Sequence, residues 1–278
     1  MRSENTSRDG IDIYYSETPD FHVVNTHFHN VYQMIYVCEG NASIKIDNKN
    51  YNVTKSCIIF ISNLEKHSVS IQKSPYKRYV ISLAPNFCHM MLKDSLLLSV
   101  LVQRPAEFSH VIALSDDLAE SVEKILGAMM KEKNQQQAFY TIRLASLVTE
   151  LLIRLYRCFG SYFPLNNKSR AANIVTDIQR YIADNAQNDL TLEQMAAMHY
   201  VSKYYLTRIF KDITGYTFKD YLILHRLSIA KDLLIHTDLS VTDVCFQSGY
   251  NNINHFIRIF KNYEGVTPYQ YKKSYKPL

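Results

Sequence analysis

The spacing of apolar residues changes along the chain and divides it into two halves. From about residue 11 to 83, short segments alternate between apolar and polar positions, as at Ile44 and Ile46 in "ASIKID". Further strands are expected at "CIIFI", "HSVSIQK" and "KRYVISL", and a turn is expected at "DNKN", residues 47–50. Short strands at this spacing are typical of an all-β barrel or sandwich. We therefore expect an antiparallel β-barrel in the N-terminal half.

Helical spacing begins beyond Pro85 and predicts two accessory helices that close this half. Their apolar stripes consist of Leu118, Val122, Ile125 and Met129 in the first helix, and Ile142, Ala145, Thr149, Leu152 and Tyr156 in the second. The segment "FGSYFPLNNKSRAAN" then combines glycine, proline and a polar run, which predicts a linker. The expected domains are residues 1–160 and 173–278, joined by a linker at 161–172.

The C-terminal half is helical and repeats itself. "YYLTRIFKDITGYTFKDY", from Tyr204, returns fifty residues later as "NHFIRIFKNYEGVTPYQY", from Asn254. Each copy reads as a short helix, a turn and a second helix, which is a helix-turn-helix. The residues at capping-box positions are Thr191 and Gln194 in the first copy, and Ser240 and Asp243 in the second. A long helix marked by Ile223, Leu227, Ala230 and Leu234 joins the copies, so the expected fold is α+β, with an all-α C-terminal domain.

The second helix of each copy has an outward face suited to a DNA major groove. In the first copy the buried positions are Leu206, Ile209, Phe210 and Ile213, and the outward ones are Lys203, Tyr204, Thr207, Arg208 and Lys211. In the second copy the buried positions are Phe256, Ile259, Phe260 and Tyr263, and the outward ones are Ile253, Asn254, Ile257, Arg258 and Lys261. Arginine can bridge guanine, asparagine can read adenine, and lysine can neutralise phosphate. The two isoleucines either touch thymine methyl groups or pack against a neighbouring element.

Charge and cysteine content are consistent with a DNA-binding protein in a reducing cytoplasm. The chain has a formal net charge of +5, and the basic excess is one up to residue 165 and four from residue 166 onward. The five cysteines are scattered and never spaced as CxxC, so neither a disulfide framework nor a zinc knuckle is expected. No stretch has the eighteen or more apolar residues that a membrane span needs, so secretion and membrane insertion are not expected.

Residues 173 to 273 resemble the DNA-binding domain of the AraC/XylS family. The resemblance rests on "SKYYLTRIFKDITG", "HRLSIAKDLL" and "VTDVCFQSGYNNINHFIRIFKNYEGVTPYQY", in that order. It implies base contacts by Tyr204, Thr207, Arg208, Ile253, Asn254, His255 and Arg258, and backbone contacts by Ser202, Lys203, Lys211 and Lys261. It also implies a homodimer formed through the helices between about 115 and 158, and it admits RNA polymerase as a further partner. The chain departs from the family pattern at Cys245, which we expect to be a buried small residue, and at Lys272.

Histidines in the N-terminal half suggest a ligand site. "THFHNVYQMIYVCEG" places His27, His29 and Gln33 on one strand face by parity, and His67 lies downstream. The arrangement resembles the cupin fold, with Gln33 where metal-binding cupins carry glutamate and Gly40 at the motif's closing glycine. By the resemblance to AraC-type regulators, we expect these four side chains to line a small-molecule pocket with apolar walls such as Ile35 and Val37, without a cofactor. The alternative is that three imidazoles hold Zn²⁺ or Fe²⁺.

Two classes of function remain open for the chain. The first is a transcription regulator, not an enzyme, whose N-terminal domain senses a small molecule and whose C-terminal domain binds double-stranded DNA. The second is a cupin metalloenzyme with a helical appendage. The doubled helix-turn-helix favours the regulator.

Overall fold

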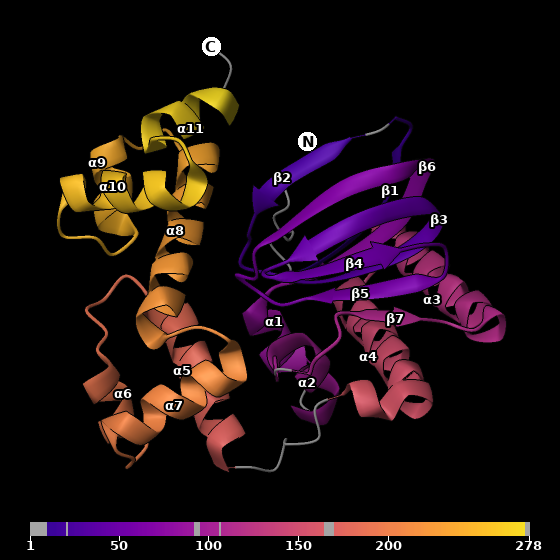
Figure 1. Ribbon diagram of the computed structural model, residues 1–278, viewed down its shortest axis with the longest axis horizontal. Coiled ribbons are helices and arrows are strands. Elements are labelled where there is room, and N and C mark those ends of the chain that lie inside the picture. Colours follow the sequence, from indigo (N-terminus) through magenta and orange to yellow (C-terminus); the bar gives the residue numbers. More distant parts are fainter. Residues whose placement is uncertain (1–9, 21, 92–94, 106, 164–169, 276–278) are drawn as a thin grey trace. The chain divides into compact units, whose positions relative to one another are not determined.

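The protein is described by a computed structural model of residues 10–20, 22–91, 95–105, 107–163 and 170–275. The chain divides into two compact units, Met1–Lys168 and Ser169–Leu278 (Figure 1). Residues 164–169 of the predicted linker lie outside the described residues, and helix α5 (Arg170–Asn185) begins within the predicted linker range. None of the helices in these described ranges is long and apolar enough to cross a membrane.

In its described residues the N-terminal unit contains one antiparallel sheet of seven strands. They are β1 (Ile11–Thr18), β2 (Val23–His27), β3 (Tyr32–Ile46), β4 (Lys49–Val53), β5 (Cys57–Ile61), β6 (His67–Leu83) and β7 (Val111–Ala113). The strand order is β1-β6-β3-β5-β7, with β2 paired to β6 and β4 paired to β3. The antiparallel sheet is as predicted, but the described pairings leave it open at β1 and β7, so it is not a closed barrel. Strand β7 has three residues and pairs with β5 alone among the described strands.

Strand β6 corrects the prediction of two separate strands at "HSVSIQK" and "KRYVISL". The chain continues through Pro75, because the neighbouring strand β3 bulges at the same level and accommodates the irregular segment. Gly40 lies in this bulge with φ +86, and a Cβ there would be 2.5 Å from the carbonyl oxygen of Pro75. Only glycine lets the two backbones approach this closely.

Across the bulge in β3, the odd-numbered and even-numbered side chains exchange the sheet faces on which they lie. Before the bulge in β3, Met34 points toward the helices and Ile35 points into a second apolar cluster, whereas after it the even-numbered Ile44 lies in that second cluster. A shift of one residue moves every following side chain to the other face of a strand. The sheet therefore supports two apolar cores. One is formed with the helices, and the other is formed among residues of the strands themselves.

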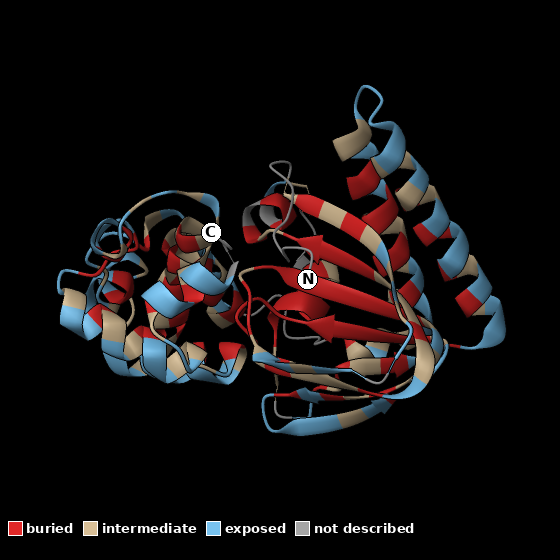
Figure 2. Ribbon diagram, turned by 90° about the horizontal axis from the view of Figure 1, so that it is seen from above, coloured by how far each residue is buried: buried red, intermediate tan, exposed pale blue. Residues whose placement is uncertain are grey.

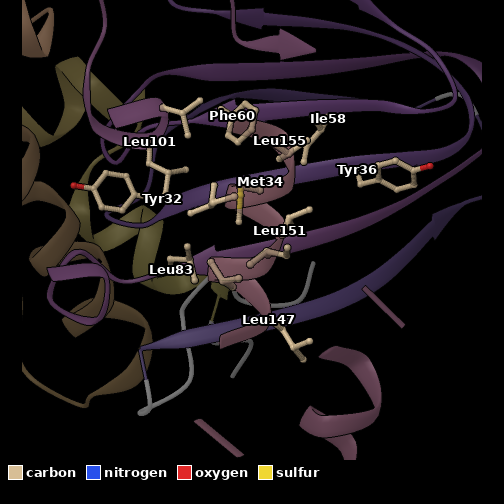
Figure 3. Close-up of a cluster of buried hydrophobic side chains, with 14 of the residues drawn as sticks. Tyr32, Met34, Tyr36, Ile58, Phe60, Leu83, Leu101, Leu147, Leu151 and Leu155 are labelled. Carbon is tan, nitrogen blue, oxygen red and sulfur yellow. The ribbon is translucent and has the colours of Figure 1, made fainter. Parts of the chain in front are cut away.

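The helices that accompany the sheet include α1 (Pro85–Met91), α2 (Ser95–Val102), α3 (Asp116–Gln135) and α4 (Tyr140–Phe159), followed by the short η1 (Gly160–Tyr162). In Figure 3 the side chain of Met34 from β3 lies beside Leu151 and Leu155 of α4, and the Tyr36 ring lies at one edge of the same cluster. The predicted stripe of α4 is partly wrong, because Ile142 is 54% exposed and leucines such as Leu151 fill the buried face instead. The stripe of α3 is confirmed at its buried positions Val122, Ile125 and Met129, and Leu118 packs partly buried against the same core.

The C-terminal unit is wholly helical in its described residues. After α5 come α6 (Leu192–Met198), α7 (Lys203–Thr214), α8 (Phe218–His236), α9 (Val241–Gln247), α10 (Ile253–Glu264) and α11 (Pro268–Tyr275). Figure 2 shows buried positions running through the middle of this unit, with exposed positions on the outer faces of its helices. The predicted long connecting helix is α8, and Leu227, Ala230 and Leu234 are buried along it.

Candidate DNA interface and ligand site

The first helix of each repeat begins at the predicted capping box. Thr191 Oγ1 accepts a hydrogen bond from the backbone N–H of Gln194 at 3.2 Å, and Gln194 Oε1 accepts one from the backbone N–H of Thr191 at 2.9 Å. Ser240 and Asp243 form the same reciprocal pair before α9. These boxes satisfy backbone N–H groups that no helical carbonyl can reach, so each short helix starts at a fixed residue.

Helix α7 is the second helix of the first repeat and has the predicted faces. Leu206, Ile209 and Phe210 are buried, and Thr214 takes a fourth buried position in place of Ile213, which is half-buried. The helix ends at Gly215, whose φ of +78 supplies the predicted left-handed cap.

The outward side chains of α7 are all exposed, namely Lys203, Tyr204, Thr207, Arg208 and Lys211. Tyr204 is 81% exposed, which leaves its ring free to reach a ligand. Ser202 serves as the N-cap, since its hydroxyl accepts from the Tyr205 N–H at 3.1 Å. Lys203 forms an exposed ion pair with Glu193 of α6, so a phosphate would have to displace that carboxylate.

Helix α10 repeats this design. Phe256 and Phe260 are buried, while Ile259 and Tyr263 are half-buried rather than fully inside. The exposed residues of this helix include Asn254, His255, Arg258 and Lys261. Both isoleucines of the outward face, Ile253 and Ile257, are half-buried, so each has one side against its own unit and one side toward solvent.

An open groove of about 650 Å³ lies beside α10 and is also lined by Asp189, in the segment before α6, and by α8. Its lining includes Asn254 and Arg258 of the predicted reading face, together with Arg226 and Tyr250. Arg226 Nε donates to the carbonyl oxygen of Ala186 at 2.8 Å, and its guanidinium lies 5.7 Å from the centre of the Tyr250 ring. Sequence reasoning assigned no role to Arg226, whose hydrogen-bond partner lies 40 residues away in the chain. Arg226 links the segment between α5 and α6 to the turn of the second repeat.

The two turns differ in length. Helix α10 begins 50 residues after α7, but α9 begins 49 residues after α6, so the second turn is one residue longer. Gly249 lies in this turn with φ +89, and a Cβ there would be 2.7 Å from the carbonyl oxygen of Ala186 and 2.8 Å from Cα of Gln187. Glycine is therefore required for both its backbone angle and its lack of a side chain.

The two departures from the family pattern are structural. Cys245 is fully buried, as predicted, and burial raises the pKa of its thiol. Lys272 Nζ donates to the carbonyl oxygen of Leu239 at 2.7 Å and so ties α11 to the chain just before α9. Neither residue belongs to an outward face of α7 or α10.

The histidines of the N-terminal unit converge, but not on one strand as predicted. His27 ends β2 and is paired with His67 at the start of β6, His29 lies in the following loop, and Gln33 lies in β3. The chain bends at Asn30, whose side-chain oxygen accepts from Asn63 Nδ2 at 3.2 Å, because the loop is bound to the segment before β6. A strand-parity argument fails across such a bend.

The three rings form a compact cluster. Ring centres are 4.2 Å apart for His27 and His67, 4.9 Å for His29 and His67, and 6.0 Å for His27 and His29. One nitrogen of each ring lies within 4.8 Å of a nitrogen of each other ring. His29 and His67 are buried and His27 is half-buried. Gln33 is also buried, and its amide donates to Ser82 Oγ at 3.4 Å.

A buried ionic network lies directly before His67, and sequence reasoning missed it. Glu65 Oε1 is 2.7 Å from Arg104 Nε and 3.0 Å from His110 Nε2, and Glu65 Oε2 accepts from the backbone N–H of Ser62 at 2.6 Å. Burial would raise the pKa of Glu65, but the Arg104 guanidinium and the His110 hydrogen bond hold it well below its usual range. These partners are 39 and 45 residues away in sequence, so no local pattern indicates them.

Comparisons with known proteins identify both units. A family model described as an AraC-like ligand binding domain matches residues 10–152, just over half of the chain, and a helix-turn-helix domain matches residues 195–274. The HTH-type transcriptional activator RhaS of Klebsiella pneumoniae is 23% identical over 235 residues, which are 84% of this chain and 82% of RhaS. The HTH-type transcriptional regulator YtdP of Bacillus subtilis is 34% identical over 106 residues, which are 38% of this chain and 14% of YtdP.

Solved structures of ToxT from Vibrio cholerae share the fold of the whole chain. An apo ToxT variant has a TM-score of 0.63 at 14% identity, covering 99% of this chain and 100% of its own. ToxT bound to an unsaturated fatty acid has a TM-score of 0.62 at 15% identity, covering 95% of this chain and 94% of its own. With both family models in the expected order and the doubled helix-turn-helix intact, the chain belongs to the AraC family of transcriptional regulators.

Proposed function

We propose that the chain binds a specific operator through α7 and α10 together. The observation that carries this proposal is the pair of matched outward faces. Each presents exposed polar side chains that include an arginine and a lysine, at Arg208 and Lys211 and again at Arg258 and Lys261. Such faces suit base edges and phosphates of successive major grooves, about 34 Å apart on one side of B-DNA. The base contacts proposed are those of Tyr204, Thr207, Arg208, Ile253, Asn254, His255 and Arg258.

The proposed backbone contacts are those of Lys203, Lys211 and Lys261, with Ser202 contributing mainly as a cap. Lysine neutralises phosphate without reading sequence. Lys203 can do so only by exchanging Glu193 for a phosphate oxygen. This exchange makes DNA binding by α7, in the first repeat, sensitive to competing salt.

The N-terminal unit is proposed to bind a small effector that changes DNA binding and is not chemically converted. Buried polar groups inside the sheet support this assignment, notably Gln33, His29 and His67. The hydroxyl of Tyr76 is buried as well, and among the described residues it has no hydrogen-bond partner. A ToxT structure of the same fold holds an unsaturated fatty acid, so a protein with this fold can bind a small molecule. A tenfold change in operator affinity requires about 1.4 kcal/mol of coupling.

A homodimer is proposed to form through α3 and α4. Phe139, just before α4, is 77% exposed and Ile142, in its first turn, is 54% exposed, so a second copy would cover apolar surface there. Sedimentation at micromolar concentration, with and without DNA, should show the dimer, and a monomer under both conditions would contradict it. RNA polymerase is proposed as a further partner, which activation of transcription would require. The cytoplasm is proposed as the location of the protein, because its DNA partner lies there.

The test is selection of bound sequences from randomised double-stranded DNA, followed by footprinting of the enriched site. Two protected major grooves on one face of the DNA are expected, one helical turn apart. A single protected groove, or the absence of any enriched sequence, would contradict the proposal that α7 and α10 bind the operator together. Adding candidate effectors to the same DNA-shift assay then tests whether the N-terminal unit controls binding.

A further inference from the structure

We propose that His27, His29 and His67 bind one divalent first-row transition metal ion, with Zn²⁺ as the best fit. The sequence favoured a small-molecule pocket lined by these histidines over a metal site. The structure brings all three rings together from β2, the following loop and β6. Three imidazoles within contact distance are the donor set that zinc, iron and nickel accept.

The hydrogen bonds of the rings already select the nitrogens for coordination. Each Nδ1 lies beside a backbone carbonyl oxygen: that of Asn25 for His27 at 3.0 Å, of Val31 for His29 at 3.1 Å, and of Glu65 for His67 at 2.9 Å. A carbonyl oxygen can only accept, so each Nδ1 carries the proton and each neutral ring keeps its lone pair on Nε2. This second hydrogen bond is the one that metal-ligating histidines characteristically make.

The backbone around the cluster is held in place from two sides. The carbonyl oxygen of His29 accepts from the Leu64 N–H at 2.8 Å, which joins the loop of His29 to the segment before His67. In that segment the Glu65 carboxylate is fixed by Arg104 and His110, while its carbonyl oxygen orients His67. Glu65 is therefore a positioning residue, since it acts on the proposed ligand through the backbone.

The geometry needs little adjustment to hold an ion. Zinc–nitrogen bonds of about 2.0 to 2.1 Å place the nitrogens of a tetrahedral site about 3.3 Å apart. One nitrogen of each ring lies within 4.8 Å of a nitrogen of each other ring, so ligating nitrogens at that separation have to close by at most about 1.5 Å. Three protein ligands leave a fourth position for water or for an oxygen donor of the effector. That last role rests on the proposed sensing function, whereas metal binding itself does not.

The experiment measures Zn²⁺ binding by the full chain, stripped with a chelator and titrated against a chromophoric competitor in the absence of DNA. One ion per chain is expected, and His29→Ala and His67→Ala should each weaken binding at least tenfold. His22→Ala is the matched control, because His22 is an exposed histidine of the same unit outside the cluster. Equal affinity in the control and the cluster variants would overturn the proposal.

A second measurement on the unmodified chain avoids dependence on the folding of the variants. Co²⁺ should give the intense visible absorption of a tetrahedral site, and one equivalent of Zn²⁺ should abolish it. The weak spectrum of hydrated Co²⁺ would overturn the site. Operator binding is measured separately with chelator present, so loss of metal binding and failure of the DNA-binding proposal give different results.

Discussion

Gly249 offers a sharp test of how the second helix-turn-helix repeat is held in place. In Gly249→Ala the new methyl group would lie 2.7 Å from a backbone oxygen and 2.8 Å from a backbone Cα, and neither atom can move without displacing the segment at Ala186 and Gln187. The third neighbour is Arg226 Nε at 2.9 Å, whose hydrogen bond to Ala186 closes the same junction. The variant therefore strains the contact between the turn of the second repeat and the segment before α6, as well as its own backbone.

The expected loss in the free energy of unfolding has two parts. A left-handed backbone angle costs a non-glycine residue about 1 to 2 kcal/mol, and forcing a methyl group into filled space costs about 1 to 3 kcal/mol more. Gly265→Ala is the matched control, because Gly265 has φ +76 and a Cβ added there would meet no described atom within 4 Å. The control should lose only the first part, about 1 to 2 kcal/mol, and Gly249→Ala about 2 to 5 kcal/mol.

Urea unfolding of both full-length variants, followed by circular dichroism, measures the difference, and a DNA-shift assay measures its effect on function. Gly249→Ala should weaken operator binding more than Gly265→Ala, since it displaces the turn that carries α10 toward the DNA. If both variants lose the same free energy of unfolding, within about 0.5 kcal/mol, the close packing at Gly249 does not hold the second helix-turn-helix repeat in place.

Three further predictions follow from the described contacts. Arg208→Ala and Arg258→Ala should each weaken operator binding by about 1 to 3 kcal/mol and affect nonspecific DNA less, and a silent Arg258→Ala variant would count against the second head. Glu193→Gln frees Lys203 from its ion pair, so nonspecific DNA should bind more tightly and depend more steeply on salt, by up to about 0.9 in the log–log slope; an unchanged slope would argue against a phosphate contact. Burial lowers the pKa of His225 to about 4, below its value in the unfolded chain. The unfolded chain therefore binds more protons, and the free energy of unfolding falls as the pH drops from about 6.5 to about 4. The expected loss between pH 7 and pH 5 is about 2 kcal/mol. His225→Leu should remove this loss in urea titrations at the two pH values, and an identical pH dependence in both proteins would contradict the buried, neutral ring.

The C-terminal unit was predictable because its signals are local. The capping box at Thr191 and the left-handed cap at Gly215 lie within a few residues of the helix ends that they define. Helical periodicity then identified the buried face of α7. The role of Arg226 was not predictable, because its partners lie about 40 residues away and no periodic pattern marks them.

The N-terminal unit was predictable in type and less so in detail. Alternation identified strand segments, but the bulge at Gly40 and the paired irregularity at Pro75 decide where one strand continues and where the faces exchange. The histidine cluster was expected from residue type, yet its geometry depends on the bend at Asn30 and on Glu65. Both are set by partners more than thirty residues distant, which a pattern within one segment does not reveal.

The pairing of β1 with β6 has a consequence for how the chain acquires its structure. Ile11 lies opposite Leu83, so the sheet closes a loop of more than seventy residues, whereas the main contacts of the C-terminal unit join helices no more than three elements apart. Folding rates fall as contacting residues become more distant along the chain. When the full chain refolds from denaturant, the C-terminal unit is therefore expected to form first, while the sheet that is proposed to control it is still assembling.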